Sequence, residues 1–255
     1  RTLWDKGLVY EGFKVMPYSW AMETTVSNFE TRMDNAYRER QDPSATVRFE
    51  LVDVADLPGD DGLPVDVLAW TTTPWTLPSN LALAVGPELP YRVVLLDGRR
   101  VVVGAGAAAR YERELGEAEV LGEVEGSALV GRSYRPLFPY FADHAESFRV
   151  LAGDFVTTED GTGTVHLAPG FGEDDQRVCE AVGIALVCPV DEAGKFTFEV
   201  SDYEGLQVFD ANRPILRRLK EEGKLLREES YVHNYPHCWR TDEPLIYKAI
   251  SSWFV

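Results

Sequence analysis

Alternation of apolar and polar residues dominates the chain after residue 45 and predicts strands. The stretch TVRFELV at 46–52 alternates, VDVLAWTT at 65–72 follows an acidic loop rich in Gly and Pro, and YRVVLLDGRRVVVG predicts a hairpin about Asp97-Gly98. Further strands are expected within 119–130 and 148–169. The pattern therefore predicts a β-rich core.

Three stretches between and after these strands predict helices. AGAAARYEREL is rich in Ala and Glu, and GEDDQRVCEAVG has acidic residues in its first turn and Gly183 after its end. DANRPILRRLKEEG runs from a cap near Asp210 to Gly223. The helices are few and lie between or beyond the strands.

The predicted elements define an α+β, β-rich fold. We expect a barrel-like domain over 46–205 with a few peripheral helices. Two extended connecting arms flank it, an outgoing arm over 1–45 and a helix with a returning arm over 206–255. We expect the two arms to leave and return to the same place.

Composition narrows the class of protein. The chain has 255 residues, 45% of them hydrophobic and 26% charged, close to the globular norm. No apolar run approaches the roughly 20 residues of a membrane helix, and no signal-peptide stretch opens the sequence. Three scattered cysteines form neither a disulfide framework nor a CxxC site. These features predict a cytoplasmic protein with no membrane partner.

The net charge of −17 bears on the partner. A protein that grips nucleic acid through a broad surface is normally basic, because phosphate contacts dominate that affinity. Either the partner is not a nucleic acid, or the chain is one piece of a larger protein. The apolar, ordered-looking ends, with Trp4 near one and LIYKAISSWFV at the other, favour the second interpretation.

The first candidate site is WTTTPWTLPSN, over 70–80. Three consecutive threonines extend a strand-like segment, and a strand turns neighbouring side chains to opposite faces. At least one hydroxyl therefore points where a core would hold a methyl group. The β propensity of threonine alone is the alternative interpretation.

The second candidate site is GTGTVHLAPGFGEDD, over 161–175. A buried, hydrogen-bonded histidine is the commoner role for a residue such as His166, and capping is the commoner role for Asp174 or Asp175. Two adjacent aspartates cannot both cap, so one is left to face a pocket. No GxxxxGK[ST] phosphate loop follows, and no GxSxG nucleophile motif is present.

A metal site is the third possibility. His233, His237 and Cys238 are potential ligands, but a tetrahedral site needs an opposing pair. The matching arm offers Ser19 and Met22 and no cysteine. We therefore expect no metal and no zinc.

Four stretches together resemble the editing insert of isoleucyl-tRNA synthetases, often called connective peptide 1. They are KGLVYEGFKVMPYS, WTTTPWTLPSN, GTGTVHLAPGFGEDD and YPHCWRTDEPLIYKAISSWF, and they span nearly the whole chain. Sister valyl and leucyl enzymes tend to carry Thr-Thr-Arg-Pro where this chain has Thr72-Thr73-Pro74, and they lack the VHLAPG arrangement at 165–170. Neither ATP-site signature of the class I enzymes (HIGH, KMSKS) is present, so the resemblance implies an insert that does not itself aminoacylate.

The resemblance implies an activity and a role for each site residue. Water would hydrolyse the ester bond that joins a wrongly attached valine to the 3′ end of tRNA(Ile), with no cofactor. ATP would serve only the absent synthetic domain. Asp175 would bind the α-ammonium group and His166 would lie beside the terminal ribose. Thr71, Thr72 and Thr73 would line the pocket, with Thr73 contacting the water or the ester carbonyl. Trp70 and Trp75 would form walls that limit side-chain size.

The chain departs from the family pattern at two places, and two other functions remain open. Ser19, Met22 and Thr241 stand where many relatives carry zinc-binding cysteine pairs, and Phe171 stands where some have histidine. The remainder of the synthetase would supply most of the grip on tRNA. The alternatives are a catalytically silent spacer that orients tRNA, and the editing domain of a sister valyl or leucyl enzyme.

Overall fold

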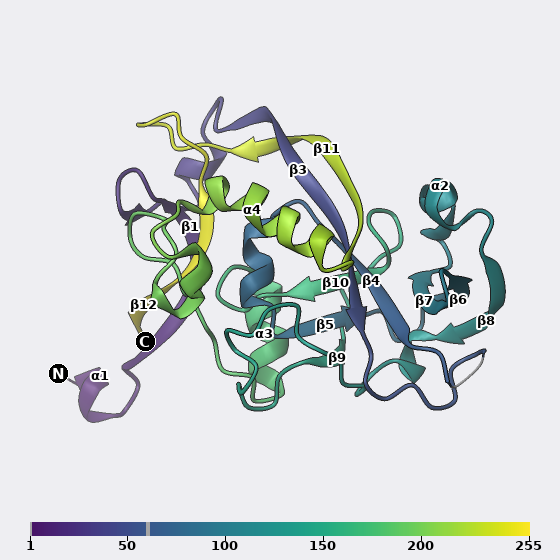
Figure 1. Ribbon diagram of the computed structural model, residues 1–255. Helices are drawn as coiled ribbons and strands as arrows, with labels where there is room; N and C mark the ends of the chain where they lie inside the picture. The colour runs from purple at the N-terminus through teal and green to yellow at the C-terminus, as the bar shows by residue number, and fades with distance from the viewer. Residues whose placement is uncertain (1, 60–61) are drawn as a thin grey trace.

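The computed structural model describes residues 2–59 and 62–255, and most of the regular structure is β (Figure 1). The strands are β1 (Tyr10–Ser19), β2 (Thr24–Thr25), β3 (Tyr37–Glu50), β4 (Val65–Thr71), β5 (Ala82–Val85), β6 (Pro90–Leu96), β7 (Arg99–Gly104), β8 (Glu119–Glu125), β9 (Arg149–Ala152), β10 (Thr164–Leu167), β11 (Leu225–Pro236) and β12 (Ile246–Phe254). The α-helices are α1 (Thr2–Asp5), α2 (Glu112–Leu115), α3 (Glu173–Ala181) and α4 (Val208–Glu221). Short 3₁₀ turns are η1 (Glu30–Arg32), η2 (Pro74–Ser79), η3 (Ala108–Tyr111), η4 (Gly126–Ala128) and η5 (Phe198–Tyr203).

The strands form three sheets. A six-stranded sheet has the order β11-β3-β4-β7-β6-β8, and two three-stranded sheets have the orders β10-β5-β9 and β12-β1-β2. The expected β-rich α+β class with peripheral helices is confirmed. Within the described residues the sheets remain separate rather than closing into a barrel, since β11 and β8 end the large sheet.

One large hydrophobic core lies between the six-stranded sheet and the β10-β5-β9 sheet. Apolar residues of β3, β4 and β5 meet in it, and all four residues of β5 are buried. Strands buried on both faces lose their polar alternation, which explains the nearly continuous apolar run of β4. This core holds β4 and β10 close together, and the candidate site lies at their ends.

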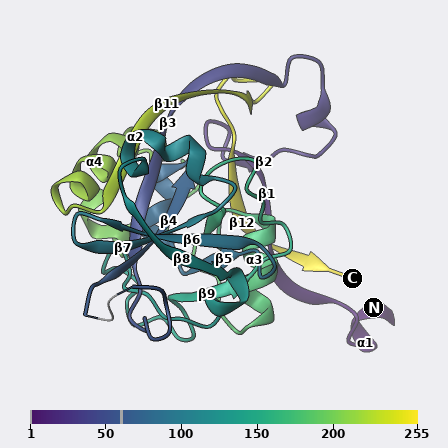
Figure 2. The ribbon, with the colours of Figure 1, turned by 90° about the vertical axis from the view of Figure 1, so that its right-hand side faces the viewer.

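The two ends of the chain run side by side. β1 pairs antiparallel with β12 in an unbroken register from Tyr10 opposite Phe254 to Tyr18 opposite Ile246. Figures 1 and 2 show both termini on the same side of the molecule, away from β6, β7 and β8. The expected arms therefore leave and return together. The boundary expected at 45/46 falls inside β3, and the division into 1–45, 46–205 and 206–255 stays a prediction.

The predicted hairpin and helices are present, with two corrections. The stretch 105–115 holds η3 followed by the four-residue α2 rather than one continuous helix. Asp97-Gly98 joins β6 to β7, and α3 and α4 occupy their predicted stretches. The cap of α4 is Gln207 rather than Asp210, because the Gln207 side chain accepts a hydrogen bond of 2.7 Å from the backbone N–H of Phe209. A cap must precede the first turn, and Asp210 already lies within it.

The triple threonine differs from its prediction. Only Thr71 belongs to a strand, and Thr72 and Thr73 form a bend before η2. Pro74 is the reason: its fixed φ suits the first turn of a helix, and it has no N–H to give to a ladder. The hydroxyls therefore do not alternate across a sheet but gather at the turn.

No helix in the described part of the chain is long and apolar enough to cross a membrane.

Candidate functional site

A cavity of about 390 Å³ opens where β4 ends, η2 begins and β10 leads into α3. Its walls include six of the seven residues predicted for the site: Trp70, Thr71, Thr72, Thr73, His166 and Asp175. These residues come from two segments that lie about 90 positions apart in the sequence, since His166 is 90 residues from Thr76. The fold thus brings the two candidate motifs to one place.

Trp75 is the predicted residue that does not reach this cavity. Its ring is 2% exposed and packs edge-on against Phe171 with the ring centroids 4.9 Å apart. Its backbone N–H donates to Asn212 Oδ1 of α4 at 2.9 Å. Because Phe171 itself lines the cavity, Trp75 supports a wall from behind.

The threonine hydroxyls form a connected network at the start of η2. Thr71 Oγ1 accepts from the backbone N–H of Thr73 at 3.0 Å and lies 3.2 Å from Thr73 Oγ1. Thr73 Oγ1 lies 3.4 Å from Thr76 Oγ1. These contacts fix the hydroxyls without satisfying every donor and acceptor, so the network can accept a further polar group in the cavity.

Thr76 is a site residue that the sequence prediction missed. Its hydroxyl donates to the backbone carbonyl of Thr73 at 2.9 Å and lies 2.9 Å from His166 Nε2. It therefore links the two motifs directly. The signal was present in the spacing, because a hydroxyl three residues after Thr73 in a 3₁₀ turn returns to the same face.

His166 is buried and neutral. Its exposed fraction is 8%, and burial lowers the pKa of its imidazole to about 4. Besides Thr76 it lies 3.5 Å, through Nδ1, from the amide nitrogen of Asn80. At neutral pH the ring therefore acts as a neutral donor and acceptor rather than as a cation.

Asp175 is the aspartate that faces the cavity. It lies in the first turn of α3, and its Oδ2 accepts from the backbone N–H of Ala168 at 2.8 Å. Burial raises the pKa of Asp175 to about 6. Asp174 points away and pairs with Arg177 at 3.0 Å.

Neither aspartate caps α3. The N-cap position of α3 is Gly172, and no side-chain hydrogen bond caps this end of the helix. A Cβ on Gly172 would stand 2.6 Å from the carboxylate of Asp175, so glycine is required for the carboxylate to sit where it does. The turn therefore serves the cavity rather than the helix end.

The residues of the cavity wall are suited to bind a small ligand that carries a cationic group or an ester. It offers the carboxylates of Asp160 and Asp175, the second with a raised pKa, one neutral imidazole and several hydroxyls, beside the apolar faces of Trp70, Phe155 and Phe171. Of the described residues that line it, none is a serine, cysteine or lysine. Thr76 Oγ1 lies 2.9 Å from both the Thr73 carbonyl and His166 Nε2, and its single hydroxyl hydrogen can go to only one of them.

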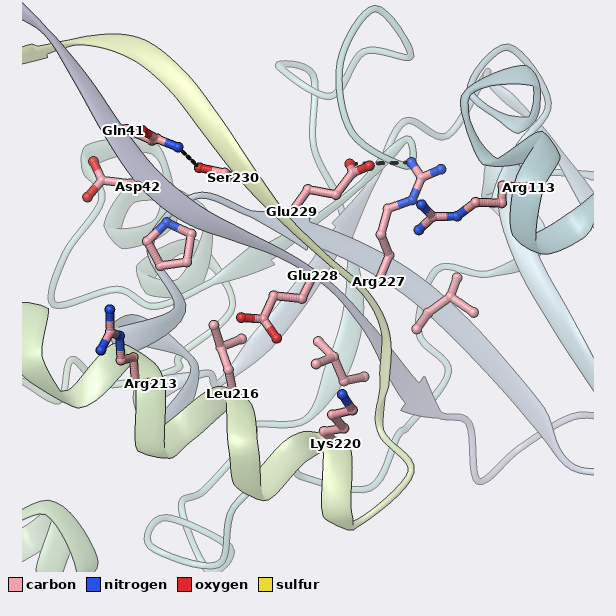
Figure 3. Close-up of a pocket in the computed structure, with 13 residues that line it drawn as sticks. Gln41, Asp42, Arg113, Arg213, Leu216, Lys220, Arg227, Glu228, Glu229 and Ser230 are labelled. Atoms are coloured by element: carbon pink, nitrogen blue, oxygen red, sulfur yellow. Dashed lines mark hydrogen bonds and ion pairs between the residues drawn. The ribbon is translucent and has the colours of Figure 1, made fainter.

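A second cavity, about 660 Å³, lies between α4 and β11 (Figure 3). Arg213 and Lys220 of α4 face Glu228 across it, and Arg227 pairs with Glu229 at 3.6 Å. It contains none of the threonine, histidine and aspartate set. Its larger volume therefore does not make it the better candidate for ester chemistry.

The potential metal ligands at the C-terminal arm have other partners. His233 Nε2 lies 3.0 Å from Asp42, and His237 Nδ1 lies 2.8 Å from the carbonyl of Tyr235. Cys238 packs with Val26 and Leu245, and its Sγ is 3.5 Å from the sulfur of Met22. Within the described residues no three His, Cys, Asp or Glu side chains gather as a metal site. Absence of zinc stays a prediction.

The chain belongs to the class I aminoacyl-tRNA synthetases, because the family model for tRNA synthetases class I (I, L, M and V) matches residues 1–255. Within that class it is similar to isoleucine–tRNA ligases. The ligase of Rickettsia felis is 55% identical over 100% of this chain and 24% of its own length, and that of Rickettsia conorii is 56% identical over the same shares. The chain thus spans about a quarter of the length of these relatives.

Solved structures agree on the fold. GlLeuRS-CP1 has a TM-score of 0.58 at 17% identity, covering 73% of this chain and 98% of that one. The editing domain of the P. falciparum cytosolic leucyl-tRNA synthetase has a TM-score of 0.55 at 10% identity, covering 73% and 98%. The architecture is therefore that of a synthetase editing domain.

Proposed function

We propose that this chain is an editing hydrolase module that removes valine from mischarged valyl-tRNA(Ile). The observation that carries the proposal is the meeting of Thr71–Thr73, His166 and Asp175 around one cavity of about 390 Å³. The similarity to isoleucine–tRNA ligases supports the proposal, because removing valine from tRNA(Ile) gives the threonine, histidine and aspartate residues a function in such an enzyme.

The need for a second site follows from the size of a methylene group. A pocket that fits isoleucine rejects valine by only about 1–3 kcal/mol, a limit for which isoleucyl-tRNA synthetase is itself the standard example. A second, smaller site that admits valine and excludes isoleucine supplies the remaining discrimination. Trp70 and Phe171, which line the cavity, are suited to limit the length of the side chain.

Asp175 binds the substrate α-ammonium group in this mechanism. The carboxylate is fixed by the Ala168 N–H and has a pKa raised to about 6 by burial. A bound cation restores the ionised form, because an opposite charge lowers the pKa of a carboxyl group. Recognition of an amino group therefore relieves the cost of the buried carboxylate.

Water attacks the ester carbonyl beside the threonine turn. Thr73 contacts the attacking water or the carbonyl oxygen, and His166 lies beside the terminal ribose. An aminoacyl ester is already reactive, so positioning and hydroxyl donors can supply the catalysis without a protein nucleophile. The acyl–oxygen bond breaks, and valine and the free tRNA 3′ hydroxyl leave.

The experiment incubates the chain at high protein concentration with valyl-, threonyl- and isoleucyl-tRNA(Ile) and measures the loss of each ester. We expect rapid loss of the valyl ester. Asp175→Asn should abolish it, while Asp174→Asn, which changes the exposed neighbour, should retain it. Full activity in Asp175→Asn would refute the assignment.

Two other outcomes identify the alternative functions. Loss of no ester, with tRNA binding shown to be saturated, identifies a spacer that orients tRNA. Loss of a threonyl ester without the valyl ester points to a sister specificity. Under this proposal, the remaining three-quarters of the full-length synthetase makes most of the contacts with tRNA(Ile). The protein acts in the cytoplasm.

A further inference from the structure

A buried polar chain runs behind the cavity and ends at His166. Tyr134, in the segment between η4 and β9, donates its hydroxyl to Asn80 Oδ1 at 2.6 Å. Tyr134 is 2% exposed and packs edge-on against the rings of Phe49 and Phe148. It does not line the cavity, so it cannot touch a ligand there.

Three contacts together orient the Asn80 amide: two backbone carbonyls at its nitrogen and the Tyr134 hydroxyl at its oxygen. Asn80 Nδ2 donates to the carbonyl of Ala82 at 2.8 Å and approaches that of Leu167 at 3.4 Å. Only the NH₂ end of an amide can donate to carbonyl oxygens. The oxygen end faces Tyr134, whose hydroxyl makes the shortest of these contacts and holds the amide against rotation.

This orientation selects the tautomer of His166. One hydrogen of the Asn80 NH₂ group goes to Ala82, and the other is shared between the Leu167 carbonyl at 3.4 Å and His166 Nδ1 at 3.5 Å. A proton on Nδ1 would oppose that donor, so Nδ1 stays an acceptor and the hydrogen resides on Nε2. The other side of the ring is consistent with this tautomer: Thr76 can accept from Nε2–H at 2.9 Å and still give its own hydroxyl hydrogen to the Thr73 carbonyl.

We propose that Tyr134 is a positioning residue that, through Asn80, holds His166 as the Nε2–H tautomer and so fixes the Thr76–Thr73 turn. Its effect on ester hydrolysis rests on the proposed function, whereas its effect on the tautomer does not. With the opposite tautomer, Nε2 would need the Thr76 hydroxyl hydrogen, and the hydrogen bond from Thr76 to Thr73 would break.

The test compares Tyr134→Phe with the unchanged chain by ¹⁵N NMR of the imidazole nitrogens, with the His166 signals assigned by their loss in His166→Gln. We expect Nε2–H alone in the unchanged chain and a mixture of tautomers in Tyr134→Phe. The kcat for valyl-tRNA deacylation should fall about 10-fold with KM little changed, the order expected for one buried hydrogen bond.

Tyr111→Phe is the matched control. It also removes one buried hydroxyl contact, that of Tyr111 with Thr46 at 3.1 Å, but lies outside the chain to His166. It should leave the tautomer and kcat unchanged. A fall in kcat in Tyr134→Phe without a change of tautomer, or Nδ1–H in the unchanged chain, would overturn the proposal.

A second variant tests the proposal if Tyr134→Phe does not fold. Asn80→Asp replaces the amide donor that faces Nδ1 with an acceptor, and should shift the proton of His166 to Nδ1. Persistence of Nε2–H alone would contradict the role of Asn80 in the chain. If neither the unchanged chain nor any variant hydrolyses the valyl ester, but the tautomers behave as expected, the proposed hydrolase function is wrong and the positioning role of Tyr134 stands.

Discussion

Adjacent residues at the start of α3 have opposite roles, and the difference comes from their surroundings. Asp174 is exposed and pairs with Arg177, while Asp175 turns into the cavity and accepts from Ala168 N–H. A surface ion pair of the first kind contributes little to stability. A buried carboxylate of the second kind is costly to keep ionised, and a substrate cation offsets that cost.

The pH dependence of deacylation follows from Asp175. Burial raises the pKa of this carboxyl group to about 6, so it is protonated below that pH and cannot bind an ammonium group. We expect kcat/KM for valyl-tRNA(Ile) to rise as the pH passes upward through about 6. His166 contributes no step there, because burial lowers the pKa of its imidazole to about 4.

A pH–rate profile between about pH 4.5 and 7.5, corrected for spontaneous hydrolysis of the ester, measures this. Asp174→Asn should keep the step and move its midpoint to lower pH, because burial comes first among the causes that raise the pKa of Asp175 and the charge of Asp174 adds to it. A profile without a change near pH 6 would contradict the assignment of the ammonium to Asp175.

The sequence indicated six of the residues that line the cavity but not how they are held. Thr71–Thr73, His166 and Asp175 are visible as short motifs, and the structure brings them to one cavity. Trp75 was expected in the cavity wall but lies behind it, and Thr76, for which no role was predicted, lines the cavity; the turn of η2, which begins at Pro74, decides which side chain faces inward. Tyr134 carries no local signal, since its partner Asn80 lies 54 residues away.

Among the elements, α3 connects the cavity to the paired arms. Gln176 Oε1 accepts from the backbone N–H of Val15 in β1 at 3.2 Å, and its amide donates to the carbonyl of Phe13 at 2.9 Å. The backbone N–H of Ala249 in β12 donates to Gly170 at 2.8 Å, next to the turn before α3. The arms therefore hold the helix that carries Asp175.

Gln176→Ala should loosen this attachment. We expect the free energy of unfolding to fall by about 1–2 kcal/mol, the order of two partly exposed hydrogen bonds. The deacylation rate should fall several-fold because the carboxylate of Asp175 is less well positioned. Urea unfolding and single-turnover deacylation measure the two effects.

Arg177→Ala is the control on the same helix, since it removes only the exposed ion pairs with Asp154 and Asp174. It should leave the free energy of unfolding nearly unchanged, because exposed ion pairs contribute little to stability. Equal losses in the two variants would mean that contact with the arms does not matter to the site.

Local patterns predicted the elements well where the determinants are local. The Asp97-Gly98 turn and the acidic start and glycine end of α3 are short-range signals, and both elements are found. The split into separate sheets depends on how β4, β5 and β10 pack through the common core. That packing involves residues distant in sequence, which alternation alone does not specify.

At the scale of the whole molecule, the net charge of −17 opposes a broad grip on tRNA. Phosphate contacts supply most nonspecific affinity for nucleic acid, and their number sets its dependence on salt. We expect this chain to bind tRNA(Ile) with a Kd weaker than roughly 10⁻⁶ M near physiological salt. The remainder of the synthetase would supply the stronger contacts.

Fluorescence titration of labelled tRNA(Ile) at several salt concentrations measures this affinity. The deacylation rate at low protein concentration should fall as salt rises, and excess protein should restore it. The matched comparison is the full-length enzyme, which should bind more tightly and with a steeper salt slope. Tight binding by the isolated chain that is insensitive to salt would contradict the electrostatic account.

The central claim is that the cavity hydrolyses a valyl ester and spares an isoleucyl ester. The most direct measurement is single-turnover deacylation of a mixture of valyl-tRNA(Ile) and isoleucyl-tRNA(Ile), each amino acid carrying a different label, at saturating protein. The account predicts that the valyl ester disappears at least about 10-fold faster, the order set by one methylene against a rigid wall. Equal rates for the two esters, or no loss of either beyond spontaneous hydrolysis, would contradict it.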